Sequence, residues 1–495
     1  MLDTIIEKTN SYISAMPKAE RKKYGQFFTS KETAQYMAGL FEISENKNEL
    51  SILDAGAGSG ILCCALIDRL NQIDSVKRIK LTCYENDEKI HDLLVENLEY
   101  LKARIETDFC YSIITENYIT SQYLEFNGLL GAEENPAKYD MVIGNPPYMK
   151  IAKDAPEATA MPEVCYGAPN LYFLFASMGL FNLKQEAEMV YIIPRSWTSG
   201  AYFKSFREYL LTNGKLQHIH LFGSRNKVFD KEDVLQETII IKVRKTADVP
   251  KHITITTSQT NKDFSKMDSI FVPYELVVSG EEKYVYLITD EKELKVLNTL
   301  HQWNNTLPKI GLRMKTGLTV DFRNRDILRN EEEEGAIPLF YSQHIKDGKV
   351  EFPIKKEHEY VVTDQKGLKQ KNRNYLFVKR FTAKEEPRRL QCGVYLAKNF
   401  SKYDSISTQN KINFIDGAME ELPECIVYGL YVIFNSSIYD SYYRILNGST
   451  QVNSTEINSM PVPDIESIGE MGKELMKSKD MSEENCNYIL EGYCG

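Results

Sequence analysis

The sequence lacks the long apolar runs and the paired cysteines that mark several classes of protein. No stretch of its 495 residues approaches the roughly 18 consecutive apolar residues of a membrane span. The start, Met1 to Thr4, has neither the basic nor the apolar region of a secretory signal peptide. The nine cysteines are scattered without a CxxC pair, which favours reduced thiols over a disulfide framework or a zinc site. We therefore expect a cytoplasmic protein that needs no membrane and no metal.

Length and charge set broad limits on organisation. A chain of 495 residues is expected to hold two or more domains, each with its own core. The net charge of −10 argues weakly against a nucleic-acid partner when it is averaged over the whole surface. Local patches therefore have to decide that question.

The stretch Asn145 to Tyr148, with the sequence Asn-Pro-Pro-Tyr, carries the most specific chemistry. It follows an apolar run, residues 139–143, that reads as a buried strand. Pro146 and Pro147 lack backbone donors and fix φ, so the chain leaves the sheet in a stiff turn. An amide oxygen and a backbone carbonyl in such a turn can accept both hydrogens of a planar –NH2 group, and the aromatic ring can stack on the attached heterocycle. Taken alone, the stretch suits a plain strand terminator equally well.

A glycine-rich turn, Asp54 to Gly60, links a strand-like run to an expected helix over residues 61–70. Gly56, Gly58 and Gly60 let the backbone approach a ligand closely. This pattern alone would also suit a nicotinamide dehydrogenase. An acidic residue directly before the glycines would repel a pyrophosphate and attract an ammonium group, which favours a cofactor that bears an amino acid.

Further polar side chains follow neighbouring apolar runs. Glu85 ends the run at residues 80–84, where a carboxylate is well placed to bind both hydroxyls of a ribose, and Asn117 follows the next run. In open α/β sheets ligands bind at the carboxyl ends of the strands. We therefore expect these two residues to share one cleft with Asp54 and Asn145.

The alternation of runs predicts the fold class. Seven strand-like runs up to about residue 245, most of the early ones separated by helices, favour a doubly wound, Rossmann-like α/β sheet. Residues 149–169 are expected to form a flap beside the site. The aromatics of the apolar helix expected at 171–183 are interpreted as core. Past about residue 250 the α/β rhythm stops, which suggests a mixed α+β domain.

Together these segments resemble the N6-adenine DNA methyltransferases of type II restriction–modification systems, in the branch with C-terminal target recognition. The resemblance implies a seven-stranded S-adenosylmethionine-dependent methyltransferase domain at 1–245 and a target-recognition domain at 246–495. It implies catalysis by Asn145, Pro146, Pro147 and Tyr148, with Tyr148 and Phe229 stacking on the target base. The cofactor-binding residues that it implies are Tyr24, Gln26, Phe28, Thr29, Asp54, Gly56, Gly58, Gly60, Glu85 and Asn117.

The sequence departs from the family after the third strand. The family usually has Asp-Phe there, with the Asp accepting a hydrogen bond from the amine of the cofactor's adenine. The best-aligned pair is Asn117-Tyr118, and an Asn can still accept through its side-chain oxygen. Asp108-Phe109 is a rival assignment.

The resemblance also implies a mechanism. The target adenine is rotated out of double-stranded DNA, because its N6 is unreachable inside the stack. The Asn145 side chain and the Pro146 carbonyl accept the two N6 hydrogens, and methyl transfer then needs mainly proximity and alignment. No metal is required. A cognate restriction endonuclease would be a genetic rather than a physical partner.

The stretch from Lys366 to Arg389 is a candidate DNA-binding segment. It carries nine Lys or Arg against two Glu, with Asn and aromatic residues between them. Basic side chains neutralise phosphates, and Arg and Asn also read base edges. The candidates are Lys371, Arg373, Asn374, Lys379, Arg380, Arg388 and Arg389. A solvated basic face is the alternative interpretation.

Other functions remain open. Asn-Pro-Pro-Tyr also occurs in methyltransferases that act on protein glutamine or on RNA bases, but the long C-terminal part with its basic segment favours DNA. A modification subunit that needs a separate specificity partner is disfavoured because the chain has its own recognition-like half. No segment reads convincingly as a nuclease.

Overall fold

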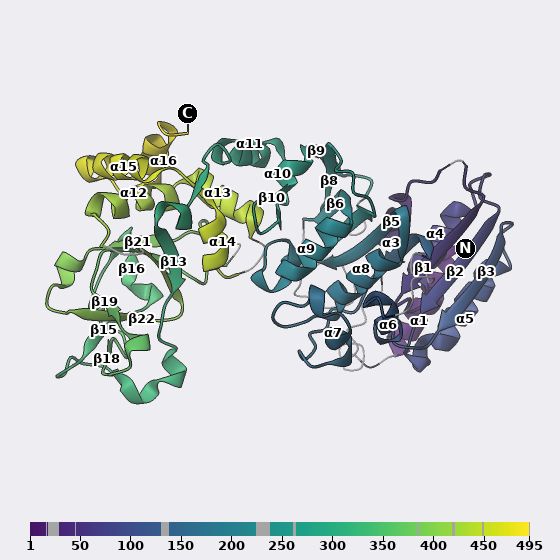
Figure 1. The fold of residues 1–495 in the computed structure, drawn as a ribbon, viewed down its shortest axis with the longest axis horizontal. Helices are drawn as coiled ribbons and strands as arrows, with labels where there is room; N and C mark the ends of the chain where they lie inside the picture. The colour runs from purple at the N-terminus through teal and green to yellow at the C-terminus, as the bar shows by residue number, and fades with distance from the viewer. Residues whose placement is uncertain are drawn as a thin grey trace. The chain divides into compact units, whose positions relative to one another are not determined.

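The computed structural model of the chain forms two compact units, Met1–Thr289 and Asp290–Gly495 (Figure 1). Within the described ranges no helix combines the length and the apolar character needed to cross a membrane. The structure describes residues 1–15, 17, 29–44, 46–129, 138–223, 238–260, 264–383, 386–417, 421–447 and 450–494.

A nine-stranded sheet is the centre of the first unit. Its order is β3-β2-β1-β4-β5-β7-β6-β8-β9, with β1 to β5 parallel and β7 antiparallel between β5 and β6. Because β2 and β3 extend from one side of β1 and β4 from the other, the topological switch point lies between β1 and β4. The strands are β1 Glu49–Ala55, β2 Arg78–Tyr84, β3 Asp108–Ile114, β4 Tyr139–Gly144, β5 Leu183–Pro194, β6 Lys215–Phe222, β7 Thr238–Arg244, β8 His252–Ser258 and β9 Asp268–Pro273.

The sheet is wider than the sequence indicated. The seven strand-like runs expected up to residue 245 correspond to β1–β7, and β8 and β9 extend the same sheet. The first compact unit therefore ends at Thr289, later than the boundary expected at residue 245. The sequence did not predict this because β8 pairs in parallel with β6 although no helix precedes it, so the strand–helix alternation typical of an α/β sheet is absent there.

Helices bury the central strands on both faces. Four helices, α1, α3, α4 and α5, share one hydrophobic core with β1 and β2. Outside that core, α8 packs against β1, β4 and β5 and against α9. The helices of this unit are α1 Leu2–Ala15, α3 Lys31–Gly39, α4 Ile61–Leu70, α5 Glu88–Lys102, α6 Tyr123–Phe126, α7 Pro156–Ala160, α8 Leu171–Asn182, α9 Lys204–Asn213 and α10 Tyr274–Val277.

Side-chain caps fix where three of these helices begin. The Ser30 hydroxyl accepts from the backbone N–H of Thr33 at the start of α3. Asp87 caps α5 and Asn170 caps α8 in the same way. Each cap satisfies a backbone donor that has no partner inside the helix.

Two glycines make room for a buried tyrosine next to β4. Tyr191 on β5 is fully buried and pairs in register with Gly144, the last residue of β4. A side chain at Gly144 would overlap the Tyr191 ring, and a Cβ at Gly179 of α8 would lie 3.0 Å from the Tyr191 hydroxyl oxygen. The three residues therefore share one packed volume directly below the turn that follows β4.

Two small sheets organise the second unit. One has the order β13-β23-β20-β21-β17-β16 and the other β14-β18-β15-β22-β19, and most of their pairs are antiparallel. The strands are β13 Leu312–Thr316, β14 Leu328–Arg329, β15 Ile337–Phe340, β16 Ile345–Lys346, β17 Lys349–Val350, β18 Tyr360–Val361, β19 Gln370–Lys371, β20 Tyr375–Lys379, β21 Cys392–Tyr395, β22 Ser405–Thr408 and β23 Ile412–Gly417.

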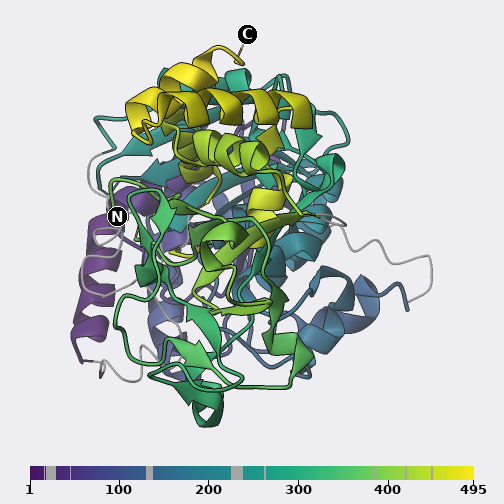
Figure 2. The ribbon, with the colours of Figure 1, turned by 90° about the vertical axis from the view of Figure 1, so that its left-hand side faces the viewer.

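Helices complete this unit. Figure 2 shows the yellow C-terminal helices lying together beside α12, above the green strands. Gly429 of α12 and Gly472 of α15 allow the two helices to cross closely, because a Cβ at either would overlap a carbonyl of the other helix. The helices are α11 Glu291–Leu300, α12 Glu424–Phe434, α13 Ser437–Leu446, α14 Ser454–Ser459, α15 Ile465–Ser478 and α16 Glu483–Glu491.

Candidate active site

Four polar residues expected at a ligand cleft lie at the same edge of the large sheet. Asp54 pairs in register with the penultimate residues of β2 and β4. Glu85 directly follows β2, Asn145 directly follows β4, and Asn117 lies just beyond β3. This edge is formed by the carboxyl ends of parallel strands on both sides of the switch point.

The rival residue Asp108 lies at the opposite edge. It begins β3, pairs in register with Arg78 at the start of β2, and accepts from the Arg78 Nε at 2.7 Å. Both side chains are exposed. The structure therefore leaves Asn117-Tyr118, and not Asp108-Phe109, at the edge of the sheet that carries Asp54, Glu85 and Asn145.

The glycine-rich turn is held by the neighbouring strand. The N–H groups of Gly56 and Ala57 both donate to the Tyr84 carbonyl, at 2.8 and 3.1 Å. Gly56, Gly58 and Gly60 have φ values of 73°, 56° and 78°. Residues with a Cβ rarely adopt this left-handed backbone conformation, so the tight turn from β1 into α4 requires glycine.

Asp54 presents a buried acceptor with no partner. Its side chain is 1% exposed, and its Oδ2 accepts from the Cys63 backbone N–H at 3.2 Å. Its Oδ1 has no hydrogen-bond partner among the described residues. Burial raises the pKa of this carboxyl well above its ordinary value. A cationic donor such as an ammonium group would satisfy the orphaned oxygen and stabilise the ionised form.

Glu85 holds the glycine-rich turn and keeps acceptor capacity. Its Oε2 accepts from the Gly58 N–H at 2.7 Å and its Oε1 from the Asp87 N–H at 2.9 Å. The side chain is buried, and burial raises the pKa of its carboxyl. Each carboxylate oxygen can accept a second hydrogen bond, so the hydroxyls of a ribose fit this position.

An aromatic wall beside the glycines was missed by the sequence interpretation. A Cβ at Gly56 would lie 3.5 Å from Phe175 Cε1 and 3.9 Å from Pro147 Cδ. Phe175 is partly exposed although the neighbouring positions of α8 are buried, and its ring centroid lies 5.2 Å from that of Tyr118. The prediction that the aromatics of α8 are core is therefore wrong for Phe175. Because α8 is apolar on all sides, its sequence pattern could not single out one position.

The amide of Asn145 is held in one orientation. Its Nδ2 donates to the Thr29 hydroxyl at 3.2 Å, and its Oδ1 accepts from the Tyr148 hydroxyl at 2.7 Å. The Tyr148 hydroxyl also lies 3.0 Å from the Ile192 carbonyl oxygen of β5. This network identifies the Asn145 side-chain oxygen as an acceptor and fixes which way the amide is turned.

Asn117 is engaged differently from the sequence expectation. Its Oδ1 accepts from the backbone N–H groups of Ile119 and Thr120, at 3.0 and 3.1 Å. Its Nδ2 donates to Glu157 Oε1 at 2.8 Å. The oxygen expected to accept from the cofactor thus already accepts hydrogen bonds from two backbone donors in this structure.

Some sequence-predicted site residues cannot be placed. Tyr24, Gln26, Phe28 and Phe229 lie outside the described residues. Of the N-terminal group only Thr29 is described, and it is buried next to Asn145. Among the described residues no group of three or more His, Cys, Asp or Glu side chains is arranged to hold a metal ion.

The predicted DNA-binding residues of the second unit differ widely in exposure. Lys371 is exposed, and Arg373, Lys379 and Arg380 are partly exposed. The Asn374 side chain joins two segments, since its Nδ2 donates to the Leu422 carbonyl and its Oδ1 accepts from the Ala397 N–H. Asn374 is therefore occupied by structural contacts.

Arg389 is part of the core. It is 1% exposed, its Nε donates to the Thr382 hydroxyl at 3.1 Å, and its guanidinium carbon lies 5.5 Å from the centroid of the Tyr443 ring. Its backbone N–H donates to Asp440. Arg389 is therefore a structural residue here, and its side chain is not accessible to DNA.

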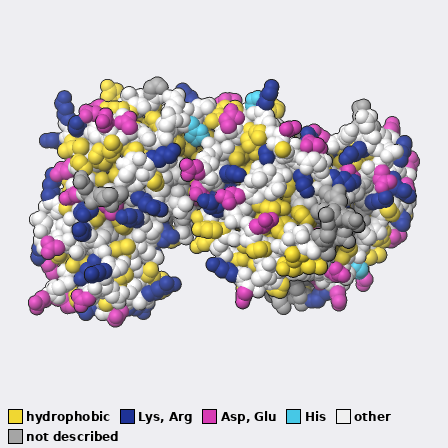
Figure 3. Space-filling model, in the orientation of Figure 1, with side chains coloured by type: hydrophobic (Ala, Val, Ile, Leu, Met, Phe, Trp, Pro, Cys, Tyr) yellow, Lys and Arg dark blue, Asp and Glu magenta, His cyan; other side chains and the backbone are white. Residues whose placement is uncertain are grey.

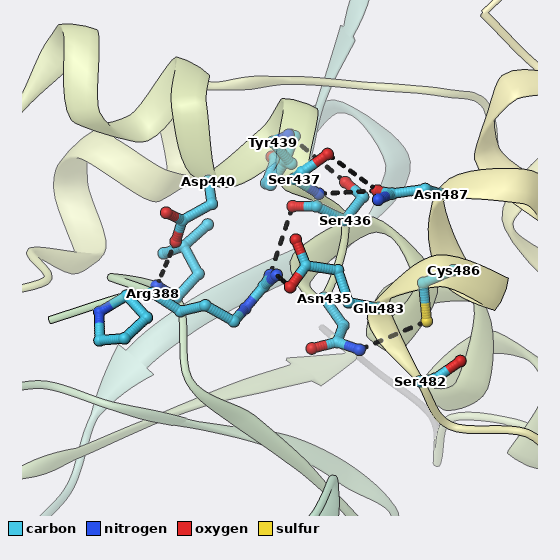
Figure 4. Close-up of polar contacts among 12 residues, drawn as sticks. Arg388, Asn435, Ser436, Ser437, Tyr439, Asp440, Ser482, Glu483, Cys486 and Asn487 are labelled. Carbon is cyan, nitrogen blue, oxygen red and sulfur yellow. Dashed lines mark hydrogen bonds and ion pairs between the residues drawn. The ribbon is translucent and has the colours of Figure 1, made fainter.

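Arg388 is bound by helix ends. Figure 4 shows its side chain reaching toward Glu483 at the start of α16 and toward Ser436. Its Nη1 lies 2.9 Å from Glu483 Oε2, and its Nη2 donates to the carbonyls of Phe434 and Ser436 at 3.1 and 3.3 Å. With Lys379 it borders a cavity of about 670 Å³. Only part of the predicted basic segment is thus available at the surface.

Comparison with known proteins places the chain in a family. The Eco57I restriction-modification methylase family matches residues 63–229. The chain is 32% identical over 485 residues to the type II methyltransferase M.PstI of Providencia stuartii, with 96% of this chain and 93% of that protein covered. The identity to the type II methyltransferase M.BsuBI of Bacillus subtilis is also 32%, with 96% and 94% covered.

A solved structure shares the fold. The DrdV–DNA complex aligns with a TM-score of 0.52 at 14% sequence identity, over 94% of this chain and 58% of that one. The family is established by the two relatives that match along nearly the full chain. The chain belongs to the type II DNA methyltransferases of restriction–modification systems, in the Eco57I family.

Proposed function

We propose that this type II methyltransferase transfers a methyl group from S-adenosylmethionine to N6 of an adenine in double-stranded DNA. The methylated site would be protected from a cognate restriction endonuclease. The observation that carries the proposal is the oriented amide of Asn145, whose nitrogen donates to Thr29 and whose oxygen is thereby identified as an acceptor at the end of β4. Such an acceptor suits the hydrogens of an exocyclic amine.

The residues at the strand ends fit the cofactor. The orphaned oxygen of Asp54 suits the cofactor's ammonium group, and Glu85 suits the ribose hydroxyls. The ring of Phe175 bounds the space beside Gly56. S-adenosylmethionine would supply the sulfonium methyl group.

The catalytic turn would act on the target base. Asn145 Oδ1 and the Pro146 carbonyl accept the two N6 hydrogens, which makes the nitrogen lone pair available for attack. Tyr148 stacks on one face of an adenine that has been rotated out of the duplex, and Phe229 is proposed for the other face. Holding the base in line with the methyl group then supplies much of the rate enhancement.

The two units would divide the work. We assign catalysis to the first unit and target recognition to the second. In this assignment exposed cations such as Lys371 contact phosphates, whereas Arg389 and Asn374 support the fold.

Substrate class can be tested with the purified full chain and tritiated S-adenosylmethionine. We expect incorporation into plasmid DNA and not into RNA or cell protein, and N6-methyl-2′-deoxyadenosine among the digested deoxynucleosides. Incorporation into protein or RNA would contradict the proposal. Incorporation into DNA that depends on an added polypeptide would instead favour a modification subunit.

Asn145→Ala should remove transfer. Because the acceptor for the N6 hydrogens is lost, we expect the single-turnover methylation rate to fall on the order of 10³-fold or more. Binding of S-adenosylhomocysteine, measured by calorimetry, should be nearly unchanged. Asn213→Ala, an exposed Asn in α9, serves as the matched control. Normal methylation by the Asn145 variant would overturn the catalytic assignment.

A further inference from the structure

Loops from distant parts of the second unit meet at one end of its six-stranded sheet. Thr316 at the end of β13 pairs with Asn413, and Lys379 at the end of β20 pairs with Ile412, so both strands end beside the start of β23. The segments around this end form what we call the sheet-end rim: residues 317–323, 380–383, 409–411 and 450–452.

Backbone hydrogen bonds make the rim a fixed frame. Asn410 N–H donates to the Thr319 carbonyl at 2.9 Å, and Arg380 N–H donates to the Lys411 carbonyl at 2.9 Å. Val452 N–H donates to the Arg380 carbonyl at 2.7 Å. Side chains carried by these segments are therefore held at defined positions.

The rim exposes two aromatic rings, each next to an arginine. Phe322 is 64% exposed and Phe381 is 45% exposed. The guanidinium carbon of Arg323 lies 5.5 Å from the Phe322 centroid, and that of Arg380 lies 5.6 Å from the Phe381 centroid. Lys411 is also exposed, and in the described part of the chain neither Arg323 nor Lys411 forms an ion pair.

The nearby carboxylate is turned inward. Asp321 Oδ2 accepts from the Gln409 side chain at 3.0 Å, and its Oδ1 accepts from the Phe322 N–H at 2.9 Å. The acid thus helps to fix the position of Phe322. On the face drawn in Figure 3, basic and acidic side chains are interspersed.

We propose that the sheet-end rim contacts double-stranded DNA. Arg323 and Lys411 pair with phosphates, and Phe322 and Phe381 press against base faces at a deformed base step. The Arg380 guanidinium donates to the Asn410 carbonyl and to Gln451, so we assign it to holding the rim together. An exposed ring with a guanidinium beside it combines stacking on bases with pairing to phosphates, which suits nucleic acid. The inference rests on the proposed function and names surfaces that direct DNA recognition by the second unit.

The test uses the full chain with S-adenosylhomocysteine and a duplex that carries its methylation site, identified beforehand by methylation-sensitive sequencing. Phe322→Ala and Phe381→Ala should each weaken binding in fluorescence anisotropy by about 10-fold. Arg323→Ala should lower the slope of log Kd against log salt by about one. Tyr488→Ala removes an aromatic ring of α16 that is 77% exposed and should leave Kd unchanged.

The possible results distinguish failure of the rim assignment from failure of the proposed function. A wild-type chain that methylates DNA while all rim variants bind it normally would overturn the rim assignment. A wild-type chain that methylates no DNA would overturn the proposed function instead. Unchanged thermal unfolding and unchanged S-adenosylhomocysteine binding establish that the variants are folded.

A separate observation concerns the cofactor pocket. Asn117 Oδ1 is bound by the two backbone donors Ile119 and Thr120, which fixes the amide so that its –NH2 group faces Glu157. An –NH2 group can only donate, and the exocyclic amine of adenine also only donates. Asn117 in this orientation therefore cannot receive that amine.

Glu157, the partner of the Asn117 amide, has a second carboxylate oxygen that could accept a hydrogen bond from the cofactor. It lies on α7, is partly exposed, and uses Oε1 for the Asn117 amide at 2.8 Å. No described residue binds its Oε2. Tyr118, next to Asn117, packs against Phe175, and Phe175 borders the space beside Gly56. The Asn117–Glu157 pair is thus anchored to the wall of the proposed cofactor pocket.

We infer that Glu157 accepts the hydrogen bond from the adenine amine of the cofactor, oriented by Asn117. This inference also rests on the proposed function. It makes Glu157 the residue that selects adenosine over inosine in the cofactor.

Calorimetry with S-adenosylhomocysteine and S-inosylhomocysteine, without DNA, tests this role. The wild-type chain should prefer the adenosyl ligand by at least about 10-fold, since a carbonyl facing Glu157 leaves it unpaired. Glu157→Ala should lose the preference. Asn117→Asp combined with Glu157→Ala should restore it, because the second Asp oxygen then accepts the amine. Glu163→Ala, an exposed acid nearby, should keep it.

A Glu157→Ala variant that retains the full preference would overturn the assignment. Loss of preference in both the single and the double variant would also contradict it, because an available acceptor would then not restore selectivity. A wild-type chain that binds neither ligand would instead contradict the cofactor proposed for this site.

Discussion

The sequence predicts functional residues in both units, but the two predictions rest on different kinds of pattern. In the first unit Asp54, Glu85 and Asn145 were selected because each follows an apolar run, and they lie at one sheet edge. In the second unit basic residues were selected by local charge density, and they range from the exposed Lys371 to the buried Arg389. Strand polarity constrains positions across the whole sheet, whereas a count of charges says nothing about burial.

Arg389 gives the strongest way to test this contrast. Arg389→Ala should lower the free energy of unfolding by about 3 kcal/mol, because Thr382 loses its hydrogen-bond donor and Tyr443 loses its stacked guanidinium in a buried site. Chemical denaturation followed by circular dichroism measures the change.

Lys371→Ala is the matched control, since its side chain is exposed and no ion pair of it is seen in the described residues. It should change stability by less than about 0.5 kcal/mol. Equal effects of the two substitutions would remove the distinction between buried and exposed members of the basic segment.

Phe175→Ala tests whether the aromatic wall belongs to the cleft. The ring borders the space beside Gly56 and is partly exposed, so its loss should weaken binding of S-adenosylhomocysteine by about 10-fold. Phe173→Ala, at a fully buried position of the same helix, should mainly lower stability. If Phe175→Ala behaves like Phe173→Ala, the residue is core, as the sequence first indicated.

Asp54→Asn should raise the stability of the ligand-free protein in a pH-dependent way while it weakens cofactor binding. A carboxyl whose pKa is raised in the folded state holds its proton to higher pH than in the unfolded chain, so the ionised form destabilises the fold. Its destabilising effect is absent below pH of about 4 and grows as pH rises through the raised pKa.

We therefore expect Asp54→Asn to stabilise the ligand-free protein at pH 8 by about 1 kcal/mol, with no gain near pH 4. Thermal unfolding across that range measures the difference, and Asp108→Asn at an exposed site is the control. The same substitution should weaken cofactor binding. A gain in stability that is equal at both pH values would contradict the role given to ionisation.

The sequence predicted an element correctly where a single local pattern determines the structure. The strand runs up to β7 and the Asn-Pro-Pro-Tyr turn followed from apolar periodicity and proline stereochemistry. The sequence did not predict features that depend on which residues pack together in the folded chain. Addition of β8 to the sheet depends on a parallel pairing with β6, and the exposure of Phe175 depends on the glycine opposite it. The hydrogen bonds of Asn117 depend on backbone donors that only the folded turn brings together.

The tyrosine wedged between two glycines has an evolutionary consequence. Because Gly144 has no room for a side chain and Gly179 has little while Tyr191 is present, the order in which these positions can change is restricted. A larger residue at 144 becomes tolerable only after Tyr191 has been replaced by a smaller one, which first creates a cavity, and the same replacement relieves the tight contact at 179. The three positions should therefore show sign epistasis, and divergence at the base of the catalytic turn should proceed through Tyr191.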